Sequence, residues 1–212
     1  DPSVKRKSGF LTPFYKGSDN LGSSFSVPYF YAISKSKDLT LKPRIYLNNE
    51  YIFHNEYREA FKNSDLIADF SFNTDANSSN THLFVDLVGD IDDKTEYEVS
   101  IQSVSNDNYF KIHDIKDYTK IITSDSSLKT YVSIDRDIDN DTNFNSSFIV
   151  YEDLSQIDSD KYQYIFPNFN FSKEINIDKS YNGQFDFLSS GFQKVYDTNK
   201  YEALINNDFN FN

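Results

Sequence analysis

Apolar and polar residues alternate regularly along this chain in segments of about ten residues. In the stretch 39–47, Leu39 and Ile45 occupy one set of alternate positions, and Lys42 and Arg44 occupy the other. Successive side chains of a β-strand point to opposite faces, whereas a helix repeats every 3.6 residues. The pattern therefore predicts a strand with one apolar and one polar face.

The same alternation continues along the chain. Phe53 and Tyr57 alternate with Glu56 and Arg58, and Asp69 interrupts the next apolar run in the same way. With an opening hairpin, the chain holds about eleven such segments, each close to the ten residues of a membrane-spanning strand. We therefore expect an all-β fold with an antiparallel up-and-down sheet, and strands of this length fit a transmembrane β-barrel.

Two places depart from the alternation. Around Phe166–Pro167 the apolar positions change parity, which predicts a β-bulge. Residues 104–127 do not alternate, and there Phe110, Ile112 and Ile115 predict a short helix inside a long loop. The other connections are alternately short and long, as in outer-membrane barrels.

Alternation alone also fits a soluble, surface-exposed β-sandwich that binds carbohydrate or protein. A third possibility is a small closed barrel, in which the first strand pairs with the last. For a barrel segment, the residues expected to face lipid are Leu39, Leu41, Ile45, Phe53 and Tyr57. Those expected to face a polar lumen are Lys42, Arg44, Glu56, Arg58 and Asp69.

Composition limits the partners. The net charge of −12 argues against nucleic acid, which needs a basic surface. Phe and Tyr make up 17% of the residues, which is far from the composition of a disordered chain. The 212 residues contain no cysteine, so neither a disulfide nor a thiolate metal site can form within them.

Candidate chemistry is sparse. No motif for a catalytic serine, a zinc protease or a phosphate loop occurs, so we expect neither an enzyme nor a cofactor. His54, His82 and His113 are far apart in sequence, and we expect them to be structural or solvated. The run Asp135–Asp141 has carboxylates at every second position but lacks the glycine and closing glutamate of a calcium loop, so we expect a solvated turn without metal.

The opening hairpin, Ser8–Tyr31, carries a proline in each arm, Pro13 and Pro28. Proline cannot donate a backbone hydrogen bond to a neighbouring strand. Both arms are therefore expected to be weakly paired.

Four blocks in this region resemble, in order, the start of the barrel domain of the LPS-assembly protein LptD family, also called organic solvent tolerance proteins. They are Arg6–Pro13 (RKSGFLTP), Val27–Ile33 (VPYFYAI), Asp38–Pro43 (DLTLKP) and Glu56–Arg58 (EYR). One departure is Tyr31, where many members have tryptophan.

The resemblance implies a protein of the cell outer membrane that passes lipopolysaccharide through a lateral seam of its barrel into the outer leaflet. The family barrel has about two dozen strands. Residues 1–212 are therefore expected to be its N-terminal portion, without the periplasmic jelly-roll domain and the remaining strands. The first and last strands meet at the seam, and Pro13 and Pro28 occupy the matching positions of the lateral gate. Implied partners are lipopolysaccharide, outer-membrane lipid, a lipoprotein plug in the lumen and periplasmic bridge proteins.

Overall fold

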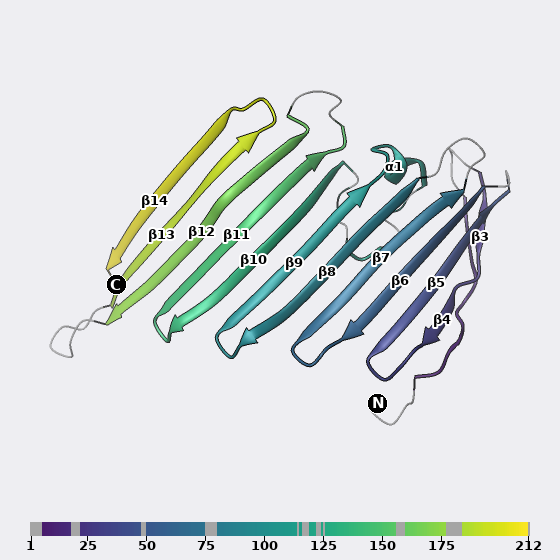
Figure 1. The fold of residues 1–212 in the computed structure, drawn as a ribbon, viewed down its shortest axis with the longest axis horizontal. Coiled ribbons are helices and arrows are strands. Elements are labelled where there is room, and N and C mark those ends of the chain that lie inside the picture. The colour runs from purple at the N-terminus through teal and green to yellow at the C-terminus, as the bar shows by residue number, and fades with distance from the viewer. Residues whose placement is uncertain are drawn as a thin grey trace. The chain divides into compact units, whose positions relative to one another are not determined.

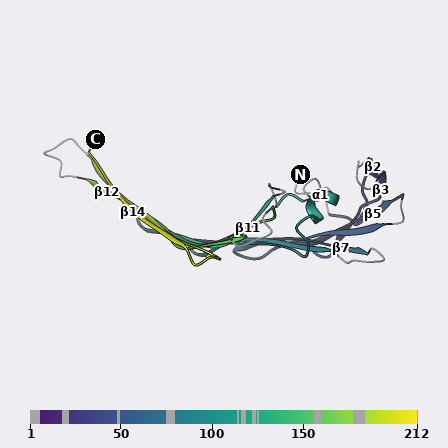
Figure 2. The same cartoon turned by 90° about the horizontal axis from the view of Figure 1, so that it is seen from above.

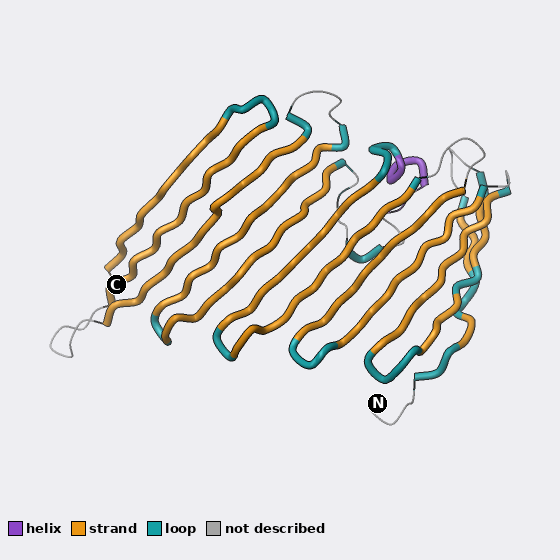
Figure 3. Tube along the Cα trace, in the orientation of Figure 1, coloured by secondary structure: helices purple, strands orange, loops and turns teal. Residues whose placement is uncertain are grey.

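A computed structural model describes residues 6–17, 22–47, 50–74, 80–113, 115, 119–121, 124, 126–155, 160–176 and 184–211. The chain forms two compact units. The first contains residues 1–87 and 101–128, and the second contains residues 88–100 and 129–212. Strands dominate both units (Figure 3).

The first strands are β1 (Gly9–Phe10), β2 (Phe14–Lys16), β3 (Ser24–Ser26), β4 (Tyr29–Ala32), β5 (Lys37–Tyr46), β6 (Tyr51–Ala60) and β7 (Ser64–Thr74). The two strands shared between the units are β8 (Thr81–Asp92) and β9 (Thr95–Val104). They are followed by α1 (Tyr109–His113) and then by β10 (Ser127–Asp139), β11 (Thr142–Asp153), β12 (Tyr162–Asn176), β13 (Gln184–Tyr196) and β14 (Tyr201–Phe211) (Figure 1).

The strands pair in the order β1-β4-β5-β6-β7-β8-β9-β10-β11-β12-β13-β14, while β2 pairs with β3 and β3 also with β5. From β5 onward each strand neighbours the next one in the chain, which confirms the predicted antiparallel, up-and-down, all-β arrangement. The 14 described strands belong to one sheet, so the two packed sheets of a sandwich are not found among them. β1 and β14 are the two ends of this order, so the first-to-last pairing expected of a small closed barrel is not found there either.

The strand count is higher than expected because the prolines break the opening hairpin. Pro13 lies between β1 and β2, and Pro28 lies between β3 and β4, so each arm becomes two short strands. β14 was not expected, because Asn206 and Asn207 interrupt its alternation. It nevertheless pairs with β13 over its whole length.

The predicted bulge in β12 is confirmed. The register of β12 against β13 shifts between Ile165 and Asn168, the interval that contains Pro167. Proline is tolerated there because an irregular position needs no donor for the ladder.

The expected helix is also found, with one difference in its packing. α1 buries Tyr109, Phe110 and His113, and Ile115 after it is buried as well, whereas Ile112 is exposed. In the view of Figure 2, α1 lies to one side of the strands of the first unit. No helix in the described part of the chain is long and apolar enough to cross a membrane.

Candidate functional site on the polar face of β5 to β8

The two faces of the sheet in the first unit have opposite chemistry, and the polar face is the buried one. On β5, Arg44 is 1% exposed and its neighbour Ile45 is 48% exposed. On β6, His54 is 2% exposed and Phe53 is 39% exposed. A sheet of a water-soluble protein normally shows the reverse arrangement, with its apolar face covered and its polar face open. The sheet is therefore built for surroundings that accept an apolar face.

The residues expected on each face are found on opposite sides of the sheet. Arg44 and Asp69 are buried, and Lys42, Glu56 and Arg58 are half-buried on the same side. On the other side, Leu41, Ile45 and Phe53 are exposed, and Leu39 and Tyr57 are half-buried. That the first side lines a lumen and the second contacts lipid stays a prediction.

Two polar residues of the apolar face have partners of their own. The amide nitrogen of Asn55 donates to the backbone carbonyls of Phe53, at 3.1 Å, and Phe70, at 3.4 Å. Glu59, near the end of β6, forms an ion pair with Lys37 at 2.8 Å. Both contacts keep polar atoms from lying unsatisfied on this face.

Charges on the polar face are paired with one another. The buried carboxylate of Asp38 accepts hydrogen bonds from Arg6 Nη1 at 2.7 Å and Arg58 Nε at 2.8 Å. Lys42 Nζ lies 2.9 Å from Glu56 Oε2. The bridge by Asp38 joins the N-terminal segment to β5 and β6.

A segment that includes α1 covers part of this face. Arg44 Nη1 donates to the backbone carbonyl of His113 at 2.5 Å, which joins β5 to the end of α1. Phe110 packs against Phe84 of β8, with ring centroids 5.4 Å apart. These contacts explain why polar side chains of β5 to β8 are buried.

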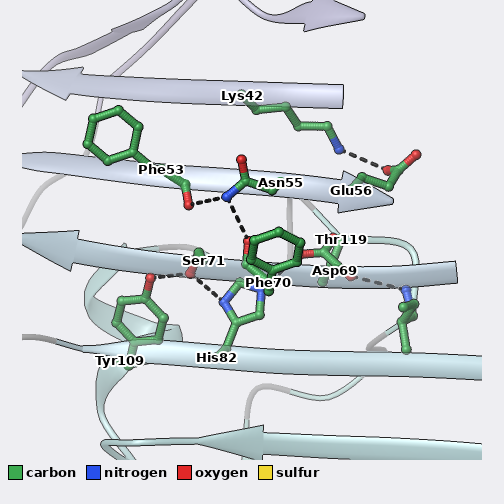
Figure 4. A network of polar contacts seen from close by, with 11 residues as sticks. Lys42, Phe53, Asn55, Glu56, Asp69, Phe70, Ser71, His82, Tyr109 and Thr119 are labelled. Carbon is green, nitrogen blue, oxygen red and sulfur yellow. Dashed lines mark hydrogen bonds and ion pairs between the residues drawn. The ribbon is translucent and has the colours of Figure 1, made fainter. Parts of the chain in front are cut away.

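The centre of the site is a continuous chain of hydrogen bonds (Figure 4). Tyr109 Oη lies 2.5 Å from Ser71 Oγ, which lies 2.7 Å from His82 Nδ1. His82 Nε2 lies 2.8 Å from Asp69 Oδ1. Burial raises the pKa of Tyr109 to about 12, although the hydrogen bond with Ser71 acts in the opposite direction. Tyr109 is therefore a neutral donor at physiological pH.

The direction of each hydrogen bond in this series follows from the groups at its two ends, the Asp69 carboxylate and the Tyr109 hydroxyl. A carboxylate oxygen accepts, so we assign the donor in this contact to His82 Nε2–H. With a neutral imidazole, His82 Nδ1 then accepts from the Ser71 hydroxyl, and Ser71 accepts from Tyr109. The set includes the three residue types of a serine hydrolase, but Ser71 is buried and its hydroxyl is held by Tyr109. The arrangement fits a structural role that anchors α1 on the strands.

The three histidines, which were expected to be structural or solvated, lie close together although they are far apart in sequence. The rings of His54 and His82 have centroids 5.8 Å apart, and His113 Nε2 lies 3.1 Å from the amide nitrogen of Asn73. All three are buried, so none is solvated. His54, Asp69 and His82 each offer a ligand atom, and these atoms all lie within 4.8 Å of one another. Sequence reasoning missed this group because its members come from three strands, although all three fall on polar positions.

The two gate prolines lie at breaks of the strands. Among the described residues of this hairpin, β1 pairs with β4 at Gly9–Phe30 and Phe10–Tyr29, and β2 pairs with β3 from Phe14 to Lys16. Pro28 still accepts a hydrogen bond from the backbone N–H of Leu11 at 2.8 Å. The gate function itself is untested and stays a prediction.

A third proline lies opposite the same break, which the sequence reading did not identify. Ser26 of β3 pairs with Arg44, and Tyr29 of β4 pairs with Leu41. Residues 27–28, which include Pro28, therefore lie opposite residues 42–43 of β5, which include Pro43. Neither proline can donate a backbone hydrogen bond, so this stretch of the pairing is weak.

The run Asp135–Asp141 forms the end of the β10–β11 hairpin, in the second unit. Asn143 Nδ2 donates to Asp135 at 2.8 Å and to Asp137 at 3.0 Å, and the backbone N–H of Asp141 donates to Asp139 at 3.0 Å. These carboxylates have hydrogen-bond donors from the protein. This geometry fits the expected solvated turn.

Comparisons with known proteins show a local sequence match and distant structural likenesses. No family model matches the chain. The LPS-assembly protein LptD of Cupriavidus pinatubonensis is 35% identical over 54 residues, which are 26% of this chain and 7% of that protein. The chain thus spans only a small part of this relative's length. A solved bacterial polysaccharide outer membrane secretin aligns with 92% of this chain and 79% of its own at 8% identity and a TM-score of 0.31, a likeness too distant to indicate function.

Proposed function

We propose that this chain is part of an outer-membrane β-barrel, with the apolar face of β5 to β7 toward lipid and the polar face toward the lumen. The observation that carries the proposal is the reversed burial of the two faces, with Ile45 and Phe53 open and Arg44 and His54 covered. Exposed apolar side chains are costly in water but stable in hydrocarbon. Strand lengths support the same conclusion, because β5, β6 and β7 have the length that crosses a bilayer.

The transported molecule that fits best is lipopolysaccharide. The local match to an LptD protein and the four sequence blocks in the first 58 residues support this assignment. On this proposal the opening hairpin is the gate side of a lateral seam, and lipid leaves the lumen there without covalent chemistry. The lipoprotein plug and the periplasmic bridge proteins are further predicted partners.

A cavity beside the opening hairpin has the chemistry that this substrate needs. Its volume is about 470 Å³, and its wall includes Phe14, Pro28, Lys16, Lys120 and the ion pair of Lys42 with Glu56. Apolar side chains and ammonium groups in one cavity suit a molecule that carries both acyl chains and phosphates.

The membrane position can be tested with tryptophan, because the 212 residues contain none. Phe53→Trp and Phe72→Trp place the probe on the exposed face, and Phe84→Trp places it on the buried face. In vesicles that contain brominated lipids, we expect strong quenching of the first two and weak quenching of the third. Equal quenching at all three positions would overturn the assignment of the faces.

The substrate can be tested separately in the full-length protein. Lys16→Gln combined with Lys120→Gln removes two ammonium groups from the cavity, and Lys62→Gln removes one from the turn between β6 and β7. With a photo-crosslinking residue in place of Phe14, we expect lipopolysaccharide crosslinks that fall several-fold in the first variant and persist in the second. Absence of crosslinks to lipopolysaccharide in the parent protein would reject this substrate while leaving the membrane assignment intact.

A further inference from the structure

Three side chains that commonly bind transition metals converge inside the polar face of the first unit. They are His54 of β6, Asp69 of β7 and His82 of β8, and all three are buried. One ligand atom from each lies within 4.8 Å of the other two. Nothing in the proposed transport function uses this group.

The pairing of the strands explains the convergence. His54 pairs with Ser71 and Glu56 pairs with Asp69, so His54 and Asp69 are diagonal neighbours on the same face. His82 reaches the same place from β8, where its Nε2 lies 2.8 Å from Asp69 Oδ1. Rigid neighbouring strands therefore hold the three groups, rather than a loop.

We propose that His54, Asp69 and His82 form a binding site for a divalent first-row transition metal, with Zn²⁺ as the best candidate. Imidazole nitrogens favour Zn²⁺, Fe²⁺ or Ni²⁺ over Ca²⁺ and Mg²⁺, which prefer oxygen ligands. Two histidines and one carboxylate are a known protein ligand set for zinc, with room for water at a further position. The carboxylate also supplies negative charge in a buried place.

The surroundings of His82 support this site. A metal-binding histidine normally uses its second ring nitrogen in a hydrogen bond that fixes the ring. His82 has such a bond, because its Nδ1 lies 2.7 Å from Ser71 Oγ. On metal binding at Nε2, the ring proton moves to Nδ1 and donates to Ser71, so the direction of this hydrogen bond reverses.

Lys42 and Arg44 lie on β5, next to the strand of His54, and their side chains contact groups other than Asp69. Lys42 Nζ lies 2.9 Å from the carboxylate of Glu56. Arg44 donates to Ser24 Oγ at 3.1 Å and to the carbonyl of His113 at 2.5 Å. The charge of Lys42 is compensated by Glu56, whereas the hydrogen bonds of Arg44 go to two neutral oxygens.

Metal would also connect the strands to α1. Ser71 contacts both His82 and Tyr109, so the hydrogen bonds that position the metal ligand are the ones that anchor the helix. A bound ion would cross-link β6, β7 and β8 beneath the covering segment.

The test uses the full-length protein, stripped with a chelator and titrated with Zn²⁺, and with Co²⁺ as a spectroscopic probe. We expect one high-affinity ion that depends on these residues. His54→Gln should weaken binding by more than about 100-fold, and Ser71→Ala should weaken it by about 10–100-fold through the orientation of His82. The Co²⁺ absorption bands of a nitrogen and oxygen site should disappear in His54→Gln.

The matched control is His113→Gln, because His113 is also buried on this face but lies outside the group of three. This variant should bind Zn²⁺ as the parent does. His54→Gln leaves the hydrogen bonds from Tyr109 through Ser71 and His82 to Asp69 in place. A loss of Zn²⁺ affinity in this variant therefore reports the loss of a metal ligand rather than a disturbed hydrogen-bond network. Equal Zn²⁺ binding by the parent and His54→Gln, or equal loss in His113→Gln, would overturn the proposal.

Discussion

The hydroxyl of Tyr109 lies 2.5 Å from the hydroxyl of Ser71, although the two residues are 38 positions apart in the sequence. This contact fastens the helix α1 to β7 on the polar face of the sheet. It also continues through His82 to Asp69, so four residues form one buried chain. Because α1 is anchored in this way, it behaves as part of the sheet rather than as a free loop.

Tyr109→Phe should loosen α1 without unfolding the strands. The variant keeps the ring but removes the donor to Ser71, which costs about 0.5–1.5 kcal/mol of docking free energy. Hydrogen exchange of the α1 amides should become faster, while exchange in β6 and β7 should not change. Tyr201→Phe, at an exposed position of β14, is the control and should leave α1 exchange unchanged. Unchanged exchange in Tyr109→Phe would mean that the hydroxyl contact does not anchor the helix.

Asp38→Asn should weaken the attachment of the N-terminal segment. The carboxylate of Asp38 is 1% exposed and bridges Arg6 and Arg58, so its neutralisation weakens two charge-assisted hydrogen bonds. We expect a loss of about 1–3 kcal/mol in the free energy of unfolding, measured by denaturant titration in detergent.

The control for this change is Asp65→Asn, an exposed carboxylate at the start of β7. Its effect should stay within about 0.5 kcal/mol. If both substitutions cost the same, the bridge by Asp38 contributes nothing specific.

Gly191→Ala should destabilise the second unit by overpacking. An added Cβ would lie 2.8 Å from Phe169 Cε1 and 2.9 Å from the carbonyl oxygen of Leu204, on the strands to either side. Overpacking of this kind costs about 1–3 kcal/mol. Gly9→Ala is the matched control because no atom lies within 4 Å of its added Cβ. Equal unfolding free energies for the two variants would show that β12 and β14 move aside at Gly191.

The faces of the strands could be predicted from the sequence because alternation depends only on the backbone. Ile45 and Arg44 were assigned to opposite sides by position, and the structure places them there. Alternation does not reveal which side is covered, since that depends on where α1 packs. The polar face is buried because Tyr109 and Phe110 pack on it, and no local pattern encodes that contact.

The group His54, Asp69 and His82 shows a second limit of sequence reasoning. Its geometry depends on the register of β6 against β7 and on the position of β8, and a shift of one residue would move His54 to the apolar face. The facing intervals of Pro28 and Pro43 depend on register in the same way. Breaks within a strand, by contrast, follow from single residues, so the effects of Pro13 and Pro28 on their own arms could be expected.

Donor-competent replacements of the hairpin prolines should close the proposed gate. In the full-length protein, Pro13→Val with Pro28→Val restores two backbone N–H groups at the breaks between β1 and β2 and between β3 and β4. The hairpin should pair more continuously and exchange its amide hydrogens more slowly. Less lipopolysaccharide should then reach the cell surface, measured by surface labelling.

Pro167→Val is the control for this double variant, because it restores a donor in the β12 bulge, outside the hairpin. Export in this control should be normal. In the double variant, slower hydrogen exchange in the hairpin together with normal export would separate weak strand pairing from lipid release. The arms would then be paired more tightly without any effect on release. That result would remove Pro13 and Pro28 from the release step and leave their breaks as a feature of strand pairing alone.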